Sequence, residues 1–219
     1  MGKNILITEQ QFDGLISDLV TWATTGFPSD EKKDNGSSGS SGSTSPTNIS
    51  PQGQELLNNP VFKEKLQEIS EAISIDKDSI IKLMQHESGL NPTIKNNIGC
   101  VGLIQFCPVG GRSTLTVNGN THSFEEIRNN LELQMDAIKD FWVKGYRNGK
   151  IKSPSDLYIY NFFPIAAGKS DDFVLQSQDL SATEVARANP IFNRTLGKPK
   201  DSPLTVGDLK DYYRQTGMV

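Results

Sequence analysis

The stretch DKDSIIKLMQHESGLNP, residues 76–92, decides the fold in the middle of the chain. Asp76 is a preferred residue for capping a helix N-terminus, and apolar residues then recur at helical spacing. Gly89 and Pro92 are residues that commonly end helices. We therefore expect a helix that begins after Asp76 and ends near Gly89, with Glu87 close to its C-terminal end.

Other capping signals predict further helices on both sides of this one. A cap residue followed by Pro, or by an acidic residue three positions later, is typical of a helix start. The capping box at Ser123 predicts one long helix over about 124–144, ended by Gly145. These signals lie at Asn59–Pro60, Ser123 with Glu126, Ser153–Pro154, Ser181 with Glu184, and Thr205 with Asp208.

One short segment between the helices has a different pattern. Residues 114–117 are followed by Asn118-Gly119, which predicts a small β-hairpin with a tight turn. The chain has 219 residues, of which 35% are hydrophobic, enough for one substantial core. The expected fold is therefore mainly α, with one minor β element.

The first 50 residues differ in composition from the rest. Thr8 and Gln11 form a capping box before an amphipathic helix over about 9–24, which either packs on the main domain or docks on a partner. The Gly/Ser-rich segment that follows predicts a flexible linker. We divide the chain into a docking helix (1–26), a linker (27–50) and a main domain (51–219).

Charge, hydropathy and cysteine usage exclude several classes of protein. Lys and Arg total 22 against 26 for Asp and Glu, with no basic stripe, so no nucleic-acid partner is expected. No apolar run predicts a membrane span or a Sec-type signal peptide. Cys100 and Cys107 form no disulfide framework, so free thiols are expected. The two cysteines together with His86 and His122 could be considered as zinc ligands, but the closely spaced Cys pair of a zinc site is missing. No metal or cofactor is therefore expected.

Glu87 is the candidate for acid chemistry. Cleavage of a glycosidic bond needs a carboxylic acid that gives a proton to the leaving oxygen, which requires a raised pKa. Glu87 follows the apolar stretch 80–84, and the negative end of the helix dipole further disfavours its charged form.

The residues around Glu87 resemble a known family. The stretch His86–Pro92, followed by Gly99–Gln105, resembles the signature of the lytic transglycosylases related to goose-type lysozyme. In that family a helix ends in Glu-Ser, an Asn-Pro turn follows, and a G-x-x-G-L-x-Q segment enters the substrate cleft. Ile159-Tyr160-Asn161 resembles the family's Ala-Tyr-Asn motif with Ile in place of Ala, whereas Phe162–Pro164 departs from the usual glycine-containing continuation. The resemblance covers about residues 60–165.

This resemblance implies a lysozyme-like α+β domain that cleaves bacterial peptidoglycan, with Glu87 as the catalytic acid and base. Ser88 and Gln105 are then expected to hold the scissile sugar or to orient Glu87. Tyr160 is expected to present its hydroxyl to Glu87 or to an acetamido group, and Asn161 to contact the substrate.

The number of carboxylates bears on the product. Ordinary glycosidases flank the scissile bond with two, but residues 88–124 contain no Asp or Glu. The resemblance implies that a single Glu acts first as acid and then as base, which gives 1,6-anhydroMurNAc ends. Asp171 and Asp172 are the nearby candidates for a hydrolytic partner, as in a muramidase, and we expect them to be solvated loop charges.

The C-terminal part of the sequence bears on where the protein acts. Residues 189–193 and 204–209 resemble the end of lysozyme-like domains in bacteriophage virion proteins. This implies a chain made in the host cytoplasm and delivered by the virion, with residues 1–26 docked on a tail or baseplate protein. Two alternatives are a structural tail protein whose domain binds glycan without turnover, and a cellular enzyme exported by a specialised secretion system.

Overall fold

The computed structural model describes residues 49–97, 99–108, 114–177 and 180–219, so the expected docking helix and nearly all of the expected linker lie outside the described residues. None of the helices in these ranges is long and apolar enough to cross a membrane. The described elements are α2 (Pro51–Asn58), α3 (Pro60–Ile73), α4 (Lys77–Ser88), β1 (Thr114–Val117), β2 (Asn120–Ser123), α5 (Phe124–Asn129), α6 (Leu131–Arg147), α7 (Pro154–Phe162), α8 (Ala182–Ala188), α9 (Pro190–Thr195) and α10 (Val206–Gln215).

The capping signals in the sequence form as expected. Asn59 accepts a hydrogen bond from the Phe62 amide at the start of α3, and Asp76 accepts one from the Ser79 amide at the start of α4. Helix α4 ends at Gly89, whose φ of 63° is left-handed. The three capping boxes expected within the described residues are present, at the starts of α5, α8 and α10, whereas the one expected at Thr8 lies outside those residues.

The long helix expected over 124–144 is two helices. Asn130 has an extended backbone (φ −129°, ψ 105°) that ends α5, and its side chain accepts from the Leu133 amide to begin α6. The expected stop at Gly145 is also wrong, because α6 continues to Arg147. Gly145 serves packing instead: a β-carbon there would lie 2.7 Å from the Tyr160 ring.

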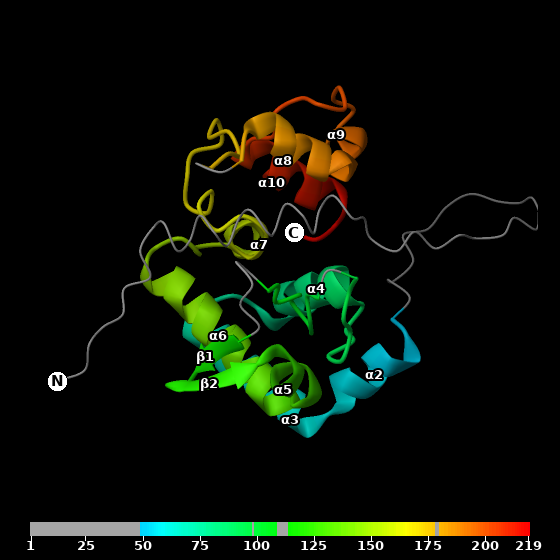
Figure 1. Cartoon of the computed structure of the whole chain (residues 1–219), viewed down its shortest axis with the longest axis vertical. Helices are drawn as coiled ribbons and strands as arrows, with labels where there is room; N and C mark the ends of the chain where they lie inside the picture. Colours follow the sequence, from blue (N-terminus) through cyan, green and yellow to red (C-terminus); the bar gives the residue numbers. More distant parts are fainter. Residues whose placement is uncertain (1–48, 98, 109–113, 178–179) are drawn as a thin grey trace, which may run out of the picture.

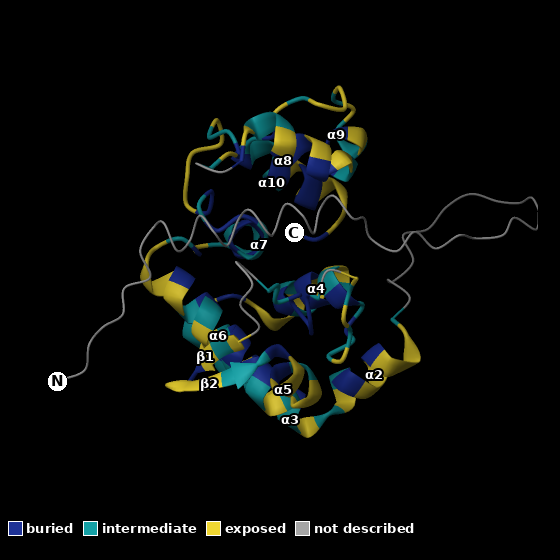
Figure 2. Ribbon diagram, viewed as in Figure 1, coloured by how far each residue is buried: buried dark blue, intermediate teal, exposed yellow. Residues whose placement is uncertain are grey.

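The helices pack around one principal core. Figure 1 shows α8, α9 and α10 grouped on one side of α7, with α3, α5, α6 and the hairpin on the other. Helix α4 packs against both α3 and α7. Most helices present a buried face inward and an exposed face outward (Figure 2). The core therefore spans both groups of helices, and α4 with Glu87 lies where they meet.

The expected hairpin is confirmed, with Thr114 opposite Ser123 and Val117 opposite Asn120. A smaller apolar cluster lies beneath it, formed by Val101, Val117, Phe124, Ile127 and Ala137. The mainly α fold with a minor hairpin is thus the one that the sequence predicts.

The expectation of free thiols is wrong, because Cys100 and Cys107 form a disulfide. Val101 and Phe106 form an antiparallel bridge with hydrogen bonds in both directions. This chain reversal brings the two flanking cysteines opposite each other, which their separation in sequence alone does not reveal.

Candidate active site

Helix α4 fixes the position of Glu87. Its inward face buries Ile80, Leu83 and Met84 completely, and the left-handed turn at Gly89 ends the helix two residues after Glu87. Glu87 therefore lies in the last turn, beside carbonyl groups that have no partner within the helix. The dipole of the helix disfavours negative charge at this end.

The surroundings of Glu87 favour its protonated form. Burial among apolar side chains raises the pKa of Glu87 to about 8, and a hydrogen bond from Asn161 acts in the opposite direction. The Asn161 Nδ2 atom donates to Glu87 Oε1 over 3.3 Å. Glu87 is thus mainly a neutral carboxylic acid at pH 7, as a general acid requires.

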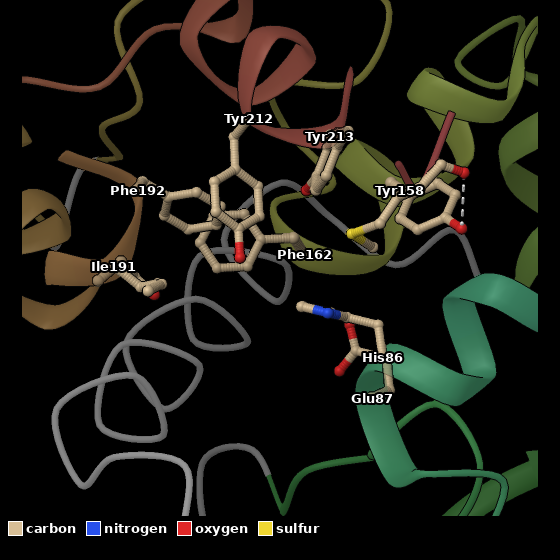
Figure 3. A pocket seen from close by; sticks show the side chains of 10 residues that line it. His86, Glu87, Tyr158, Phe162, Ile191, Phe192, Tyr212 and Tyr213 are labelled. Atoms are coloured by element: carbon tan, nitrogen blue, oxygen red, sulfur yellow. Dashed lines mark hydrogen bonds between the residues drawn. The ribbon is translucent and has the colours of Figure 1, made fainter. Parts of the chain in front are cut away.

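A pocket opens beside Glu87, with about 420 Å³ of empty space including its opening to solvent. Figure 3 shows His86 and Glu87 extending from α4 toward a wall of aromatic side chains. In that wall the Phe162 and Phe192 ring centroids lie 5.2 Å apart, and those of Phe192 and Tyr212 lie 4.5 Å apart. The lining residues are His86, Glu87, Tyr158, Phe162, Asn189, Ile191, Phe192, Tyr212, Tyr213 and Met218.

The loop of the G-x-x-G-L-x-Q motif is held rigidly. Gly102 has φ +77°, and a β-carbon there would lie 2.7 Å from the Gln134 side chain. Gln134 is fully buried; it accepts from the Leu103 amide and donates to the carbonyls of Pro92 and Ile127. Because this amide joins α6 to the loop and to the turn after α4, it fixes the segment that follows Glu87.

The residues predicted to bind substrate occupy different environments. Asn161 contacts Glu87 directly. The Ser88 hydroxyl is buried and donates to the Met84 carbonyl, and Gln105 donates from Nε2 to the Gly102 carbonyl. The Tyr160 ring packs on Phe141 with centroids 4.9 Å apart. Ser88, Gln105, Tyr160 and Asn161 are not among the described residues that line the pocket.

The sequence does not predict the aromatic wall. In the sequence, Phe162 only marks a departure from the family pattern, and Phe192, Tyr212 and Tyr213 carry no signal of a role in the site. One signal was available for part of it: Asn189-Pro190 has the same cap-and-proline pattern as Asn59-Pro60, and α9 does begin at Pro190.

The two aspartates considered as hydrolytic partners lie elsewhere. Asp171 is 70% exposed and forms an ion pair with Lys210 of α10 at 2.7 Å. Asp172 accepts a hydrogen bond from Ser170 in the same exposed loop. Among the described residues that line the pocket, Glu87 is the one carboxylate.

A helical fold with a small hairpin, and a largely neutral glutamic acid at a helix end beside a pocket, are the features expected for a lysozyme-like domain. The family model described as "Transglycosylase SLT domain" matches residues 64–141, which include Glu87, Ser88 and Gln105. This match supports a lytic transglycosylase domain over that segment, and the family indicates peptidoglycan lytic transglycosylase activity in general, with peptidoglycan as the substrate. Searches of curated proteins and of solved structures gave no match.

Proposed function

We propose that this protein cleaves the β-1,4 bond between MurNAc and GlcNAc without water, with Glu87 as both acid and base, and leaves 1,6-anhydroMurNAc ends. The observation that carries the proposal is the solitary, largely protonated carboxyl of Glu87 in a pocket whose described lining holds no second carboxylate. A hydrolytic enzyme of the usual kind needs a second carboxylate to activate water or to form a glycosyl intermediate.

The proposed reaction balances with Glu87 alone. Its proton passes to the leaving O4 of GlcNAc as the C1–O4 bond breaks, which leaves a carboxylate. That carboxylate then takes the proton of the MurNAc 6-hydroxyl while O6 bonds to C1, and Glu87 is again protonated. The Asn161 amide donates to Oε1 and stabilises the transient negative charge. No water is consumed.

Clearing of purified peptidoglycan sacculi tests the role of Glu87. Glu87→Gln keeps the shape of the side chain but has no proton to give, so we expect a loss on the order of 100-fold or more. Glu64→Gln, at an exposed position of α3, is the matched control and should clear sacculi at the wild-type rate. A folded Glu87→Gln variant that retains most of the activity would contradict the assignment. An inactive wild-type protein would favour the structural, glycan-binding alternative.

We further propose that the protein belongs to a phage particle and acts on the cell wall during entry. Support comes from the resemblance of residues 189–193 and 204–209 to virion lysozyme-like domains, and from the Gly/Ser-rich segment, whose composition suits a tether. Residues 1–26 would dock on a tail or baseplate protein. Deletion of residues 1–48 should leave the clearing of sacculi intact and abolish incorporation into particles. Incorporation of the truncated chain at the wild-type level would contradict the docking role.

A further inference from the structure

The segment 141–169 differs in charge from the rest of the chain. It contains five Lys and Arg residues against one Asp and no Glu, which gives it a net charge of +4. The whole chain has a net charge of −4, which leaves −8 for the other residues. This asymmetry gives one part of the surface a positive potential that the total charge conceals.

Four of these cations lie on the surface, outside the active-site pocket. Lys144 and Arg147 are in the last turn of α6, and Lys152 follows in the loop that leads to α7 (Figure 1). Lys169 comes after the turn that follows α7, and all four residues are exposed. We call these four residues the basic patch. None of them is among the described residues that line the pocket beside Glu87.

Two contacts join the segments that carry the basic patch. The Lys150 Nζ atom donates a hydrogen bond to the Pro164 carbonyl over 3.2 Å. A β-carbon on Gly168, whose φ is +77°, would lie 3.4 Å from the α-carbon of Lys150. The loop after α6 and the turn before Lys169 therefore pack against each other, and the cations that they carry share one region of the surface.

The basic patch has no acidic partner within the described part of the chain. None of its four side chains takes part in an ion pair there. The two aspartates nearest in sequence accept hydrogen bonds from backbone amides instead: Asp140 from Asn118, and Asp156 from Lys152. The positive charges of the patch are therefore available to an anion outside the chain.

Helix stability accounts for only half of the basic patch. The negative end of the helix dipole favours Lys144 and Arg147 in the last turn of α6. Lys152 and Lys169 lie outside any helix, and the Lys169 ammonium group lies over the Phe173 ring, 5.6 Å from its centroid. A common anionic partner accounts for all four cations.

The substrate itself supplies such a partner. Peptidoglycan strands carry short stem peptides with free carboxylate groups, so the polymer is a polyanion near pH 7. Lys and Arg side chains bind carboxylates through charge-assisted hydrogen bonds, whereas the rest of the chain, at −8, would repel this polymer. Nucleic acid suits the patch less well, because proteins that bind it commonly contact about six to ten phosphates.

We propose that the basic patch binds the carboxylates of peptidoglycan stem peptides and holds the domain on the wall beside the strand that Glu87 cleaves. This inference rests on the proposed function. The patch contacts the peptides and lies outside the pocket, so its contribution is separable from cleavage of the glycan. Because exposed ion pairs are screened by salt, this binding should weaken as ionic strength rises.

Binding of inactive protein to immobilised glycan strands tests the inference. Surface plasmon resonance of Glu87→Gln protein compares strands that keep their stem peptides with strands stripped of them by an amidase, both freed of phosphate-containing wall polymers. The patch variant adds Lys144→Gln, Arg147→Gln and Lys152→Gln. At low salt it should bind peptide-bearing strands about tenfold more weakly than its parent, the combined effect of three exposed ion pairs. It should bind stripped strands as tightly as its parent.

The matched control adds Lys63→Gln, Lys77→Gln and Lys200→Gln instead. These residues are exposed and form no ion pair within the described residues, so the control changes the net charge equally at other places. It should bind both kinds of strand as its parent does. Thermal unfolding checks that each variant keeps the fold, as expected for replacements of exposed side chains.

Several results would overturn the inference. One is a patch variant that binds peptide-bearing strands as tightly as its parent does. Another is an equal loss on stripped strands, which would place the contact on the glycan, and a third is an equal loss in the control, which would assign the effect to total charge. A loss found only on strands that retain their phosphate-containing polymers would assign the patch to those polymers. The proposed function would survive all of these results, since it fails only if wild-type protein does not release anhydro ends.

Discussion

Asn161 on α7 donates a hydrogen bond from Nδ2 to Oε1 of Glu87 on α4 over 3.3 Å. This bond links α7 to α4 at the carboxyl group of Glu87. This bond favours the charged form of Glu87, whereas burial favours the neutral form and dominates, with a resulting pKa of about 8. If Glu87 acts as proposed, the balance between these two effects sets the pH dependence of the activity.

The first prediction concerns that dependence. Activity should be high where Glu87 holds its proton and should fall as the pH rises through about 8. Asn161→Ala removes a bond to the charged form, so the alkaline fall should move to higher pH. The maximal rate should drop roughly tenfold or more, since a hydrogen bond to a charged group is worth about 1.5 to 3 kcal/mol. An alkaline limb at the same pH in both proteins would mean that this bond does not act on Glu87.

The second prediction concerns stability. Below pH 4.5, the ordinary pKa of a glutamate, Glu87 holds its proton in both the folded and the unfolded chain. Between pH 4.5 and about pH 8 the unfolded chain has released the proton, whereas the folded chain still holds it. Stability therefore falls over this range as pH rises. Glu87→Gln removes the effect and should be more stable than wild type by an amount that grows toward pH 8, on the order of 3 kcal/mol.

Urea unfolding at pH 5 and at pH 8 measures this difference. The exposed Glu64→Gln variant controls for the loss of one negative charge. A stability gain of Glu87→Gln that does not vary with pH would show that its origin is not the proton on Glu87.

The third prediction concerns the contact between Gly102 and Gln134. Gly102→Ala should destabilise the protein by at least about 2 kcal/mol, because the new methyl meets the buried amide and the backbone has φ +77°. Gly119→Ala shares the positive φ, at +82°, but meets nothing within 4 Å. The difference in unfolding free energy between the two variants isolates the contact with Gln134. Equal losses would assign the whole cost to backbone conformation.

The fourth prediction concerns the disulfide. Replacing Cys100 and Cys107 together by Ala should lower the unfolding free energy by about 2 to 3 kcal/mol, the expected effect of opening so short a loop. The rate of sacculus clearing should stay close to that of wild type, because the Val101–Phe106 bridge and Gln134 still hold the loop. Dithiothreitol should reproduce the loss in wild type and have no effect on the double variant. Insensitivity of wild type to the reductant would contradict a stabilising role.

Much of the fold follows from local rules in the sequence. The boxes at Ser123, Ser181 and Thr205, and the cap at Asp76, each involve residues three positions apart, and each forms as expected. The hairpin is also set by a local signal, because the Asn118-Gly119 turn determines which residues pair. The extended residue at Asn130 was missed because a cap inside a continuous helical pattern has little local signature.

The candidate site also has a part that the local sequence predicts and a part that depends on tertiary packing. Glu87 was predicted from a contiguous motif, and its environment follows from the apolar helix that carries it. The aromatic wall was not predicted, because it depends on how α9 and α10 fold back toward α4, and no spacing in the sequence records that. Likewise the pairing of Cys100 with Cys107 depends on a local chain reversal.

The fifth prediction is the most direct test of the central claim, that a single carboxyl, Glu87, cleaves the glycan without water. The purified protein is incubated with sacculi, and the released muropeptides are weighed by mass spectrometry. Anhydro and reducing ends differ by the mass of one water. The account predicts 1,6-anhydroMurNAc ends as the main product of the wild-type protein, and neither product from Glu87→Gln. Reducing ends as the main product would contradict it, because they require a group that activates water, and the described lining of the pocket holds no second carboxylate for that role.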